Sequence, residues 1–295
     1  MTGTPFDAAH AAAPGRRRRR SRRIGAALAY HAAMLLIAAV FMLPFYWMAI
    51  SAFKTNAEIF ADPITWWPDP IRWENVSALF TRPDFPFLRQ FWNSVFYAGM
   101  VAIGMCLSCS LAAYSFACLR WRGRNLVFAL TVAALLMPPI VTFLPTYLAW
   151  SRLGFNGTYV PLILPAFLGD AFYIFMLRQF FLGVPREIMD AARLDGASEF
   201  RIWWQIVLPQ VRTPLVIVAL FAIVYTWHDF FGPLIYLQDP QDFPLSLGLF
   251  TFRTQRAVEW SLSMMGALLT ALPLVVLFLL TQRLFQRGLM TAGPR

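Results

Sequence analysis

Most residues of this sequence that could take part in chemistry gather in one stretch. Residues 185–209 read PREIMDAARLDGASEFRIWWQIVLP and hold seven charged side chains, in a chain of 295 residues that is only 14% charged. Two short helices around a glycine can also form a DNA-binding helix–turn–helix, which needs a basic face. Here the acidic and basic charges alternate along the stretch and nearly cancel, which disfavours DNA binding. The pattern favours a surface that contacts another protein, and a solvated connecting loop is the alternative.

Two further places put ionisable side chains inside apolar runs, where charge is costly and so faces a cavity or a partner. Aromatic rings beside a carboxylate would suit a carbohydrate, because rings stack on C–H faces and the carboxylate accepts from hydroxyl groups. A buried polar contact between helices is the alternative for each place. The candidate residues are Asp170 in one run and Tyr225, Trp227, His228 and Asp229 in another.

Several kinds of chemistry have no support in the sequence. No GxxxxGK[ST] phosphate loop is present, so the chain does not bind ATP by that route. Cys106 and Cys109 have CxxC spacing without a second pair, and they share an apolar run with Cys118, which favours a packing role. No His or Cys cluster has metal-ligand spacing. We therefore expect no cofactor or metal on this chain.

Composition indicates which elements must position these groups. The chain is 59% hydrophobic and 16% aromatic, which is typical of a membrane protein. Six apolar segments each exceed the roughly 20 residues that a helix needs to cross the hydrocarbon. We therefore predict an all-α, polytopic membrane protein with six transmembrane helices. The six segments lie at 24–50, 92–119, 125–149, 158–182, 213–237 and 262–284.

Basic residues predict the orientation of these segments. Residues 16–23 hold seven arginines directly before the first apolar segment, which favours a cytoplasmic N-terminus. Eighteen of the 25 Lys and Arg then fall inside, so both termini and residues 185–209 are expected in the cytoplasm. The expected regions are a basic tail at 1–23, a first transmembrane helix at 24–53, an extracytoplasmic loop at 54–90 and a core transmembrane domain at 91–290.

Residue types in 185–209 predict two short helices joined by a turn. Pro185 suits the first helical position, and Gly196 tolerates the left-handed conformation that ends many helices. Ser198 can cap a second helix that ends at Leu208-Pro209. The first helix would present one narrow face made of Ile188, Ala191, Ala192 and Asp195.

The spacing within 185–209 carries a resemblance. The stretch contains Asp190-Ala191-Ala192, then Gly196 after three residues, Ile206 after nine more and Leu208-Pro209 after one more. This pattern resembles the cytoplasmic loop of binding-protein-dependent ABC importer permeases, where Glu is usual in place of Asp190. Further motifs resemble the sugar-transporter, or maltose-type, branch of that family, and the likeness covers about residues 25–290. They are Asn93-Ser94, residues 112–116, 137–139, 177–181 and 227–230, and the stretch from Gln282-Arg283 to Gly288-Leu289. His228 stands where Asn is usual.

The resemblance implies a transport subunit and not an enzyme: half of the membrane pathway of a carbohydrate importer in a bacterial inner membrane. The implied partners are two ABC ATPase subunits that carry ATP and Mg, a second homologous permease subunit, a solute-binding protein outside and membrane lipid, without nucleic acid. A permease for a polyol, glycerol phosphate or another nutrient, and a stand-alone carrier or membrane enzyme, are the alternatives. The implied ATPase-coupling residues are Arg186, Glu187, Asp190, Ala191, Ala192, Gly196, Leu208 and Pro209.

Overall fold

The structure, a computed structural model, describes residues 15–83, 85–252 and 258–291, with side chains described within 26–282. Helices make up most of these residues and no β-strand occurs among them, which confirms the predicted all-α fold. The longer helices are α1 (Gly15–Ser51), α4 (Phe87–Cys118), α5 (Arg124–Ala133), α6 (Pro139–Arg152), α8 (Ala171–Leu182), α9 (Arg186–Leu194), α12 (Arg212–Trp227) and α15 (Trp260–Thr291).

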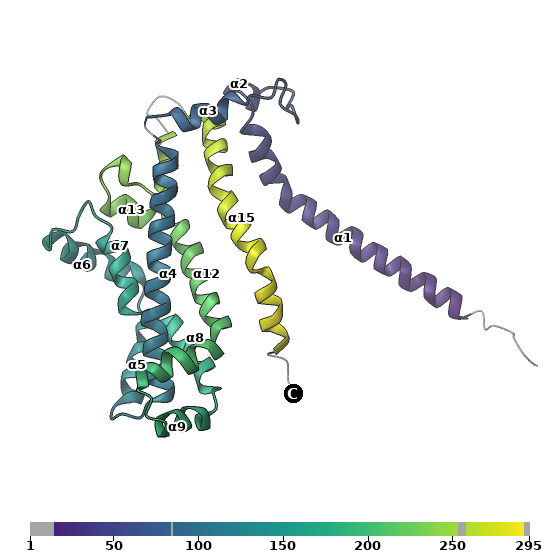
Figure 1. Ribbon diagram of the computed structural model, residues 1–295. Helices are drawn as coiled ribbons and strands as arrows, with labels where there is room; N and C mark the ends of the chain where they lie inside the picture. Colours follow the sequence, from purple (N-terminus) through teal and green to yellow (C-terminus); the bar gives the residue numbers. More distant parts are fainter. Residues whose placement is uncertain (1–14, 84, 253–257, 292–295) are drawn as a thin grey trace, which may run out of the picture.

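Short helices and turns connect the longer ones. Outside the stretch between α9 and α12 they are α2 (Asn56–Ile59), α3 (Glu74–Thr81), η1 (Ala134–Leu136), α7 (Val160–Ile163), η2 (Leu164–Leu168), α13 (Phe231–Tyr236), η4 (Pro240–Asp242), α14 (Leu245–Gly248) and η5 (Leu249–Phe252). Between α9 and α12 the chain forms α10 (Glu199–Arg201), the π-helix η3 (Ile202–Val207) and α11 (Leu208–Gln210). The helix α9 lies at one end of the molecule, and α2 and α3 lie at the other (Figure 1).

The long helix α4 is the centre of the fold (Figure 1). The helices α12 and α8 and the turn η2 pack along it. Small side chains such as Ala98 and Ala113 are buried on it and let neighbouring helices approach closely. At Gly104 a Cβ would lie 2.8 Å from the Phe167 ring and 3.1 Å from the backbone of Ala166, so a larger residue would separate α4 from η2.

Four helical segments within the described residues are long and apolar enough to cross a membrane. They are Ala26–Ser51, Phe87–Cys118, Val160–Leu182 and Trp260–Gln282. The number rises to six if each of two bent helix pairs is one span, which is the number predicted. The pairs are Arg124–Leu136 with Pro139–Arg152, bent by 100°, and Glu199–Gln210 with Arg212–Trp227, bent by 86°.

Three predicted spans are not continuous helices. The segment predicted at 158–182 is interrupted at Gly169-Asp170, between η2 and α8. The segment predicted at 125–149 breaks at Met137, because the residue before Pro138 is pushed out of the helical region. The segment predicted at 213–237 stops at Trp227 and resumes at Phe231. Here the Asp229 side chain accepts the N–H of Gly232, in competition with the helical backbone.

The first helix, α1, stands apart from the rest. Only 6% of its apolar window is buried, and it contacts α15 near the α2 end of the molecule (Figure 1). It begins at Gly15, inside the predicted basic tail at 1–23, of which residues 1–14 lie outside the described part. In the segment predicted as a loop at 54–90, Lys54 is buried and its Nζ donates to Thr65 Oγ1 at 3.0 Å.

Candidate functional site

The helix α9 carries the first half of the predicted coupling loop, residues 185–209. It begins at Arg186, and Pro185 is its extended N-cap instead of its first helical residue as predicted. Gly196 has a φ of +79°, which confirms the left-handed turn. The N–H of Gly196 donates to Arg193 O, and the N–H of Ala197 donates to Ala192 O, both at 3.0 Å. These two bonds close the helix in a Schellman motif.

The predicted narrow face of α9 is divided between buried and exposed residues. Met189 and Ala192 are buried and join a hydrophobic cluster that includes residues of α4, α8 and η3. Ile188 is exposed, and Leu194 is 90% exposed. Ala191 and Asp195 are exposed too. Ala192 does not share their face, because it lies one turn from the buried Met189 and therefore points inward with it. The outer face therefore leaves apolar side chains open.

The second half of the loop starts as predicted and ends later. Ser198 caps α10, since its Oγ accepts the N–H of Arg201 at 3.3 Å. The helical path then continues through the π-helix η3 and α11 to Gln210, whereas the sequence placed its end at Leu208-Pro209. Pro209 is tolerated because it lies in the first turn of α11, where an N–H has no helical partner. Single-turn π-helices are frequent at functional sites.

A charged network joins this loop to α4. The Arg193 guanidinium donates through Nε to Glu199 Oε1 at 2.7 Å and through Nη1 to Asp190 Oδ1 at 2.6 Å. Hydrogen bonds from Arg193 to Glu199 and Asp190 raise the pKa of Arg193, so it stays charged. The buried hydroxyl of Tyr114 on α4 donates to Glu199 Oε2 at 2.6 Å. The loop is thus tied to the central helix by a tyrosine.

Sequence reasoning did not find Tyr114 as a functional residue. The sequence indicated Tyr114 only as part of the motif at 112–116. It indicated Arg193 and Glu199 only as two of the seven charged side chains in residues 185–209. A signal was present, because a tyrosine near the end of an apolar segment can donate its hydroxyl to a carboxylate of an adjoining charged loop.

The predicted coupling residues fall into two groups. Asp190 and Ala192 take part in the network or the buried cluster, and Leu208 is half-buried. The others are exposed: Arg186, Glu187 and Ala191 on α9, Gly196 at the turn that follows it, and Pro209 in α11. Coupling remains their predicted role.

Asp229, a predicted pathway residue, lies in the break between α12 and α13. Its Oδ2 accepts the hydroxyl of Tyr97 on α4 at 2.8 Å, and its Oδ1 accepts the N–H of Gly232 at 3.0 Å. Its backbone oxygen accepts from Ser246 Oγ at 2.6 Å. A Cβ on Gly232 would lie 2.6 Å from Asp229 Oδ2, so a larger residue there would push the carboxylate out of this position. The carboxylate therefore holds the break in one geometry.

The other predicted pathway residues divide between structural contacts and open positions. Asp170 caps α8, because its Oδ1 accepts the N–H groups of Phe172 at 2.9 Å and Tyr173 at 3.1 Å. Trp227 is buried and donates to Thr270 O at 3.1 Å. Tyr225 is 76% exposed and His228 is exposed. No hydrogen bond joins Asp170 to Asp229 in the described part, and a pathway role stays a prediction.

Long apolar helices with a polar helix–turn–helix at one end define a multi-pass membrane protein. Residues 111–290 match the family described as "Binding-protein-dependent transport system inner membrane component". The chain belongs to this family. It is a permease subunit of a binding-protein-dependent importer and a transport subunit, not an enzyme.

Relatives of known annotation cover most of the chain. The arabinooligosaccharides transport system permease protein AraQ of Halalkalibacterium halodurans is 31% identical over 88% of this chain and 93% of its own length. The sn-glycerol-3-phosphate transport system permease protein UgpE of Yersinia enterocolitica is 31% identical over 87% and 93%. The lactose transport system permease protein LacG of Rhizobium radiobacter is 28% identical over 88% and 93%.

Solved structures share the fold. A chain of a bacterial ABC transporter involved in the import of the acidic polysaccharide alginate superposes with a TM-score of 0.77, covering 95% of this chain and 99% of that chain at 17% identity. A chain of a bacterial alginate ABC transporter in complex with an alginate pentasaccharide-bound periplasmic protein gives a TM-score of 0.61, covering 88% and 94% at 15% identity.

Proposed function

We propose that this chain forms half of the membrane pathway of a carbohydrate importer and is driven by two separate ABC ATPase subunits, which carry ATP and Mg. A second homologous permease subunit completes the pathway, and a solute-binding protein outside delivers the substrate. Both termini and the loop 185–209 lie in the cytoplasm of a bacterial cell. The outward face of α9 supports this proposal most directly, because it leaves Ile188 and Leu194 exposed beside Glu187.

The coupling follows from the contacts of α9 on its two sides. Its outer face would sit in a groove of an ATPase subunit, so closure of the ATPase pair on ATP moves α9. Its inner face passes the movement on through Met189 and Ala192, which pack in the same cluster as α4 and α8. The bond from Tyr114 to Glu199 gives a second link to α4. The loop is thus linked to α4 both by the hydrogen bond from Tyr114 to Glu199 and by the apolar packing of Met189 and Ala192.

Carbohydrate is favoured as substrate for two reasons. AraQ and LacG are named for an oligosaccharide and a disaccharide, whereas UgpE is named for a phosphate ester. A phosphate group crossing the membrane would need Arg or Lys deep in the spans, and the basic residues of the four long described spans, Arg89 and Arg178, lie near span ends. The basic residues of the two bent pairs each stand at the start or end of a helix, and they are Arg124, Arg152, Arg201 and Arg212. Tyr225 and His228 are the open residues near Asp229 that would contact a sugar; Asp170, Trp227 and Asp229 would shape the pathway.

Replacement of Gly196 tests the coupling proposal. A Cβ there meets no atom within 4 Å, so the cost of substitution arises from the left-handed backbone alone. We expect Gly196→Val to reduce transport at least about tenfold and to weaken co-purification of the ATPase subunits, because a β-branched residue is strained at positive φ. Gly196→Asn is the matched control, since Asn adopts this conformation more easily. Normal transport and co-purification with Gly196→Val would overturn the proposal.

A further inference from the structure

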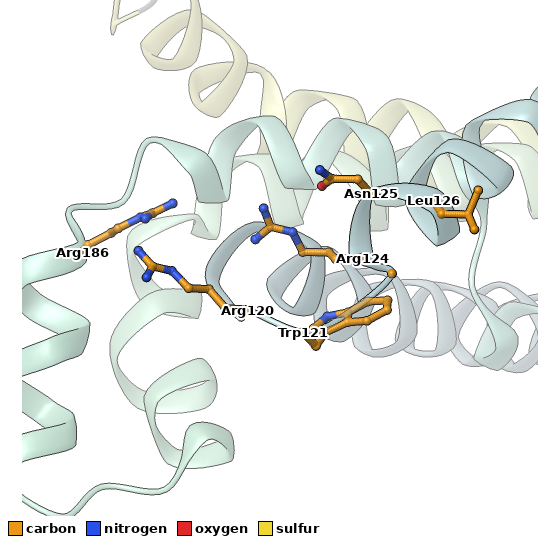
Figure 2. Close-up of a pocket in the computed structure, with 7 residues that line it drawn as sticks. Arg120, Trp121, Arg124, Asn125, Leu126 and Arg186 are labelled. Carbon is orange, nitrogen blue, oxygen red and sulfur yellow. The ribbon is translucent and has the colours of Figure 1, made fainter.

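A basic cavity lies between the α4–α5 connection and the start of α9. Its volume is about 420 Å³, and its lining contains no acidic residue. Arg120 and Arg124 enter it from the connection, and Arg186 enters it from the first turn of α9 (Figure 2). In Figure 2 the guanidinium groups of Arg120 and Arg186 point toward each other. Three positive groups therefore share one hollow.

The charges in this cavity are poorly compensated by the protein. Arg124 Nη1 donates to Leu119 O at 2.8 Å, and no hydrogen bond or ion pair within the described part of the chain engages Arg120 or Arg186. A neighbouring cavity of about 470 Å³ shares Arg120 and Arg186 and is lined by Asp190 and Glu199. Those two carboxylates are already bound to Arg193. Like charges held close together repel, and an anion placed among Arg120, Arg124 and Arg186 would relieve that repulsion.

The start of α5 adds a second feature that favours an anion. Gly123 is its N-cap, with a φ of +85°, and no side chain caps the helix. The first turn contains no acidic residue. The free N–H groups of a helix start carry partial positive charge, and the ten-residue α5 directs this end at the cavity that Gly123, Arg124 and Asn125 line. Guanidinium groups and helix N–H groups together make a common site for phosphate.

The surroundings of the cavity resemble a membrane interface. The partly exposed Trp121 lines the rim and donates its indole N–H to Ser115 Oγ at 3.1 Å. Leu126 and Leu130 are exposed one turn apart on α5, so they form an apolar strip that leads away from the cavity. Tryptophan is enriched at headgroup depth, and basic pockets between spans bind anionic headgroups. A lipid could thus place its phosphate among the arginines and an acyl chain along α5.

We propose that this cavity binds a phosphate group, supplied by the headgroup of an anionic phospholipid. The site connects the α4–α5 connection to Arg186, the first residue of α9. Bound phosphate would therefore hold the start of α9 against the end of α4. This site does not depend on which solute is transported, and its occupancy is measured without transport.

The test uses the intact importer, purified with its partner subunits in mild detergent and examined by native mass spectrometry. Phosphatidylglycerol, phosphatidylcholine and inorganic phosphate are titrated separately into wild type and into the double variant Arg120→Gln/Arg124→Gln. Arg122→Gln is the matched control, because Arg122 lies in the same connection but lines neither cavity. We expect the double variant to bind phosphatidylglycerol about tenfold more weakly, since two charge-assisted contacts are lost, and Arg122→Gln to bind like wild type.

Each outcome decides one aspect of the proposal. Selective binding of phosphatidylglycerol that the double variant loses supports a lipid source, and displacement of that lipid by inorganic phosphate at millimolar concentration supports a free anion instead. Equal binding by wild type, the double variant and Arg122→Gln overturns the site. Loss of ATPase subunits from the double variant, without any change in lipid binding, also overturns it and assigns the arginines to the ATPase. Arg120→Gln alone, at a side chain with no contact to break, covers a failure of the double variant to assemble.

Discussion

Two tyrosines of α4 bind carboxylates, but the two joins are built differently. Tyr97 donates to Asp229 at the break between α12 and α13, and Tyr114 donates to Glu199 in the loop 185–209. They are separated along the axis of α4 by about 25 Å, at about 1.5 Å per residue. One rigid helix thus connects the loop that carries the family motif to the candidate pathway residues.

The difference lies in what else holds each carboxylate. Asp229 accepts from two neutral donors, the Tyr97 hydroxyl and the Gly232 N–H. A Cβ on Gly232 would lie too close to the Asp229 carboxylate. Glu199 is bound by the charged Arg193, and its side chain is 45% exposed. Solvent screens the second join, so it contributes less stability and can be remade during a movement. We therefore expect the Asp229 contacts to persist during transport and the Glu199 contacts to break and re-form.

The largest effect is expected from Asp229→Ala. The change leaves the Tyr97 hydroxyl and the Gly232 N–H without their acceptor, at a cost of about 1–3 kcal/mol for each donor that stays buried. We expect a clear fall in the unfolding temperature of the purified complex together with loss of transport. His228→Ala is the stability control, because the neighbouring His228 side chain is exposed. A similar unfolding temperature for both variants would show that the break does not need the carboxylate.

A smaller change in stability, with a large change in coupling, is expected from Glu199→Gln. The variant keeps the size of the side chain and loses the ion pair with Arg193, which at an exposed site contributes below about 1 kcal/mol. Transport and solute-stimulated ATP hydrolysis should fall several-fold while the unfolding temperature changes little. A fall in unfolding temperature as large as that of Asp229→Ala would remove the distinction between the two joins.

Double-mutant cycles test whether the two joins are separate. Tyr97→Phe with Asp229→Asn, and Tyr114→Phe with Glu199→Gln, should each show an interaction energy of about 0.5–3 kcal/mol, as contacting residues do. The crossed pair of Tyr97→Phe with Glu199→Gln should be additive within about 0.5 kcal/mol. Coupling in the crossed pair would mean that α4 transmits strain between its ends even in the resting protein.

The smallest effect is expected from salt. The Debye length falls from about 10 Å at 0.1 M salt to about 3 Å at 1 M, and exposed ion pairs weaken accordingly. The difference in unfolding temperature between wild type and Glu199→Gln should therefore shrink at 1 M NaCl. The difference between wild type and Asp229→Ala should stay the same, since neutral donors hold that carboxylate. If salt reduced both differences in unfolding temperature equally, the conclusion that only the Glu199 join depends on an ion pair would be wrong.

The sequence predicted the parts of the fold that depend on local chemistry. Apolar length predicted the long helices, and residue types predicted the left-handed turn at Gly196 and the cap at Ser198, which the structure confirms. The break after Trp227 was missed because the run 213–237 is mostly apolar in composition, whereas its geometry depends on a hydrogen bond that the Gly232 N–H donates to the Asp229 side chain. A hydropathy pattern does not record that bond.

The candidate site shows the same division. The motif indicated the loop 185–209, but its inward face depends on which side chain the neighbouring helices can bury, and Met189 fills that place. Tyr114 was missed because it is 85 residues from Glu199 in the chain, and sequence periodicity reports only nearby residues. Contacts between distant segments are therefore what the structure adds.

The isolation of α1 has a consequence for how much of the chain is needed to fold. Ala52, directly after α1, is the first residue from the N-terminal part to join a buried cluster, and the family match begins only at residue 111. The side chains of residues 26–44 are all exposed, so deleting this stretch removes almost no buried surface within this subunit. Apart from its contact with α15, the first span adds little to the packed core, so we expect the rest of the chain to fold without it.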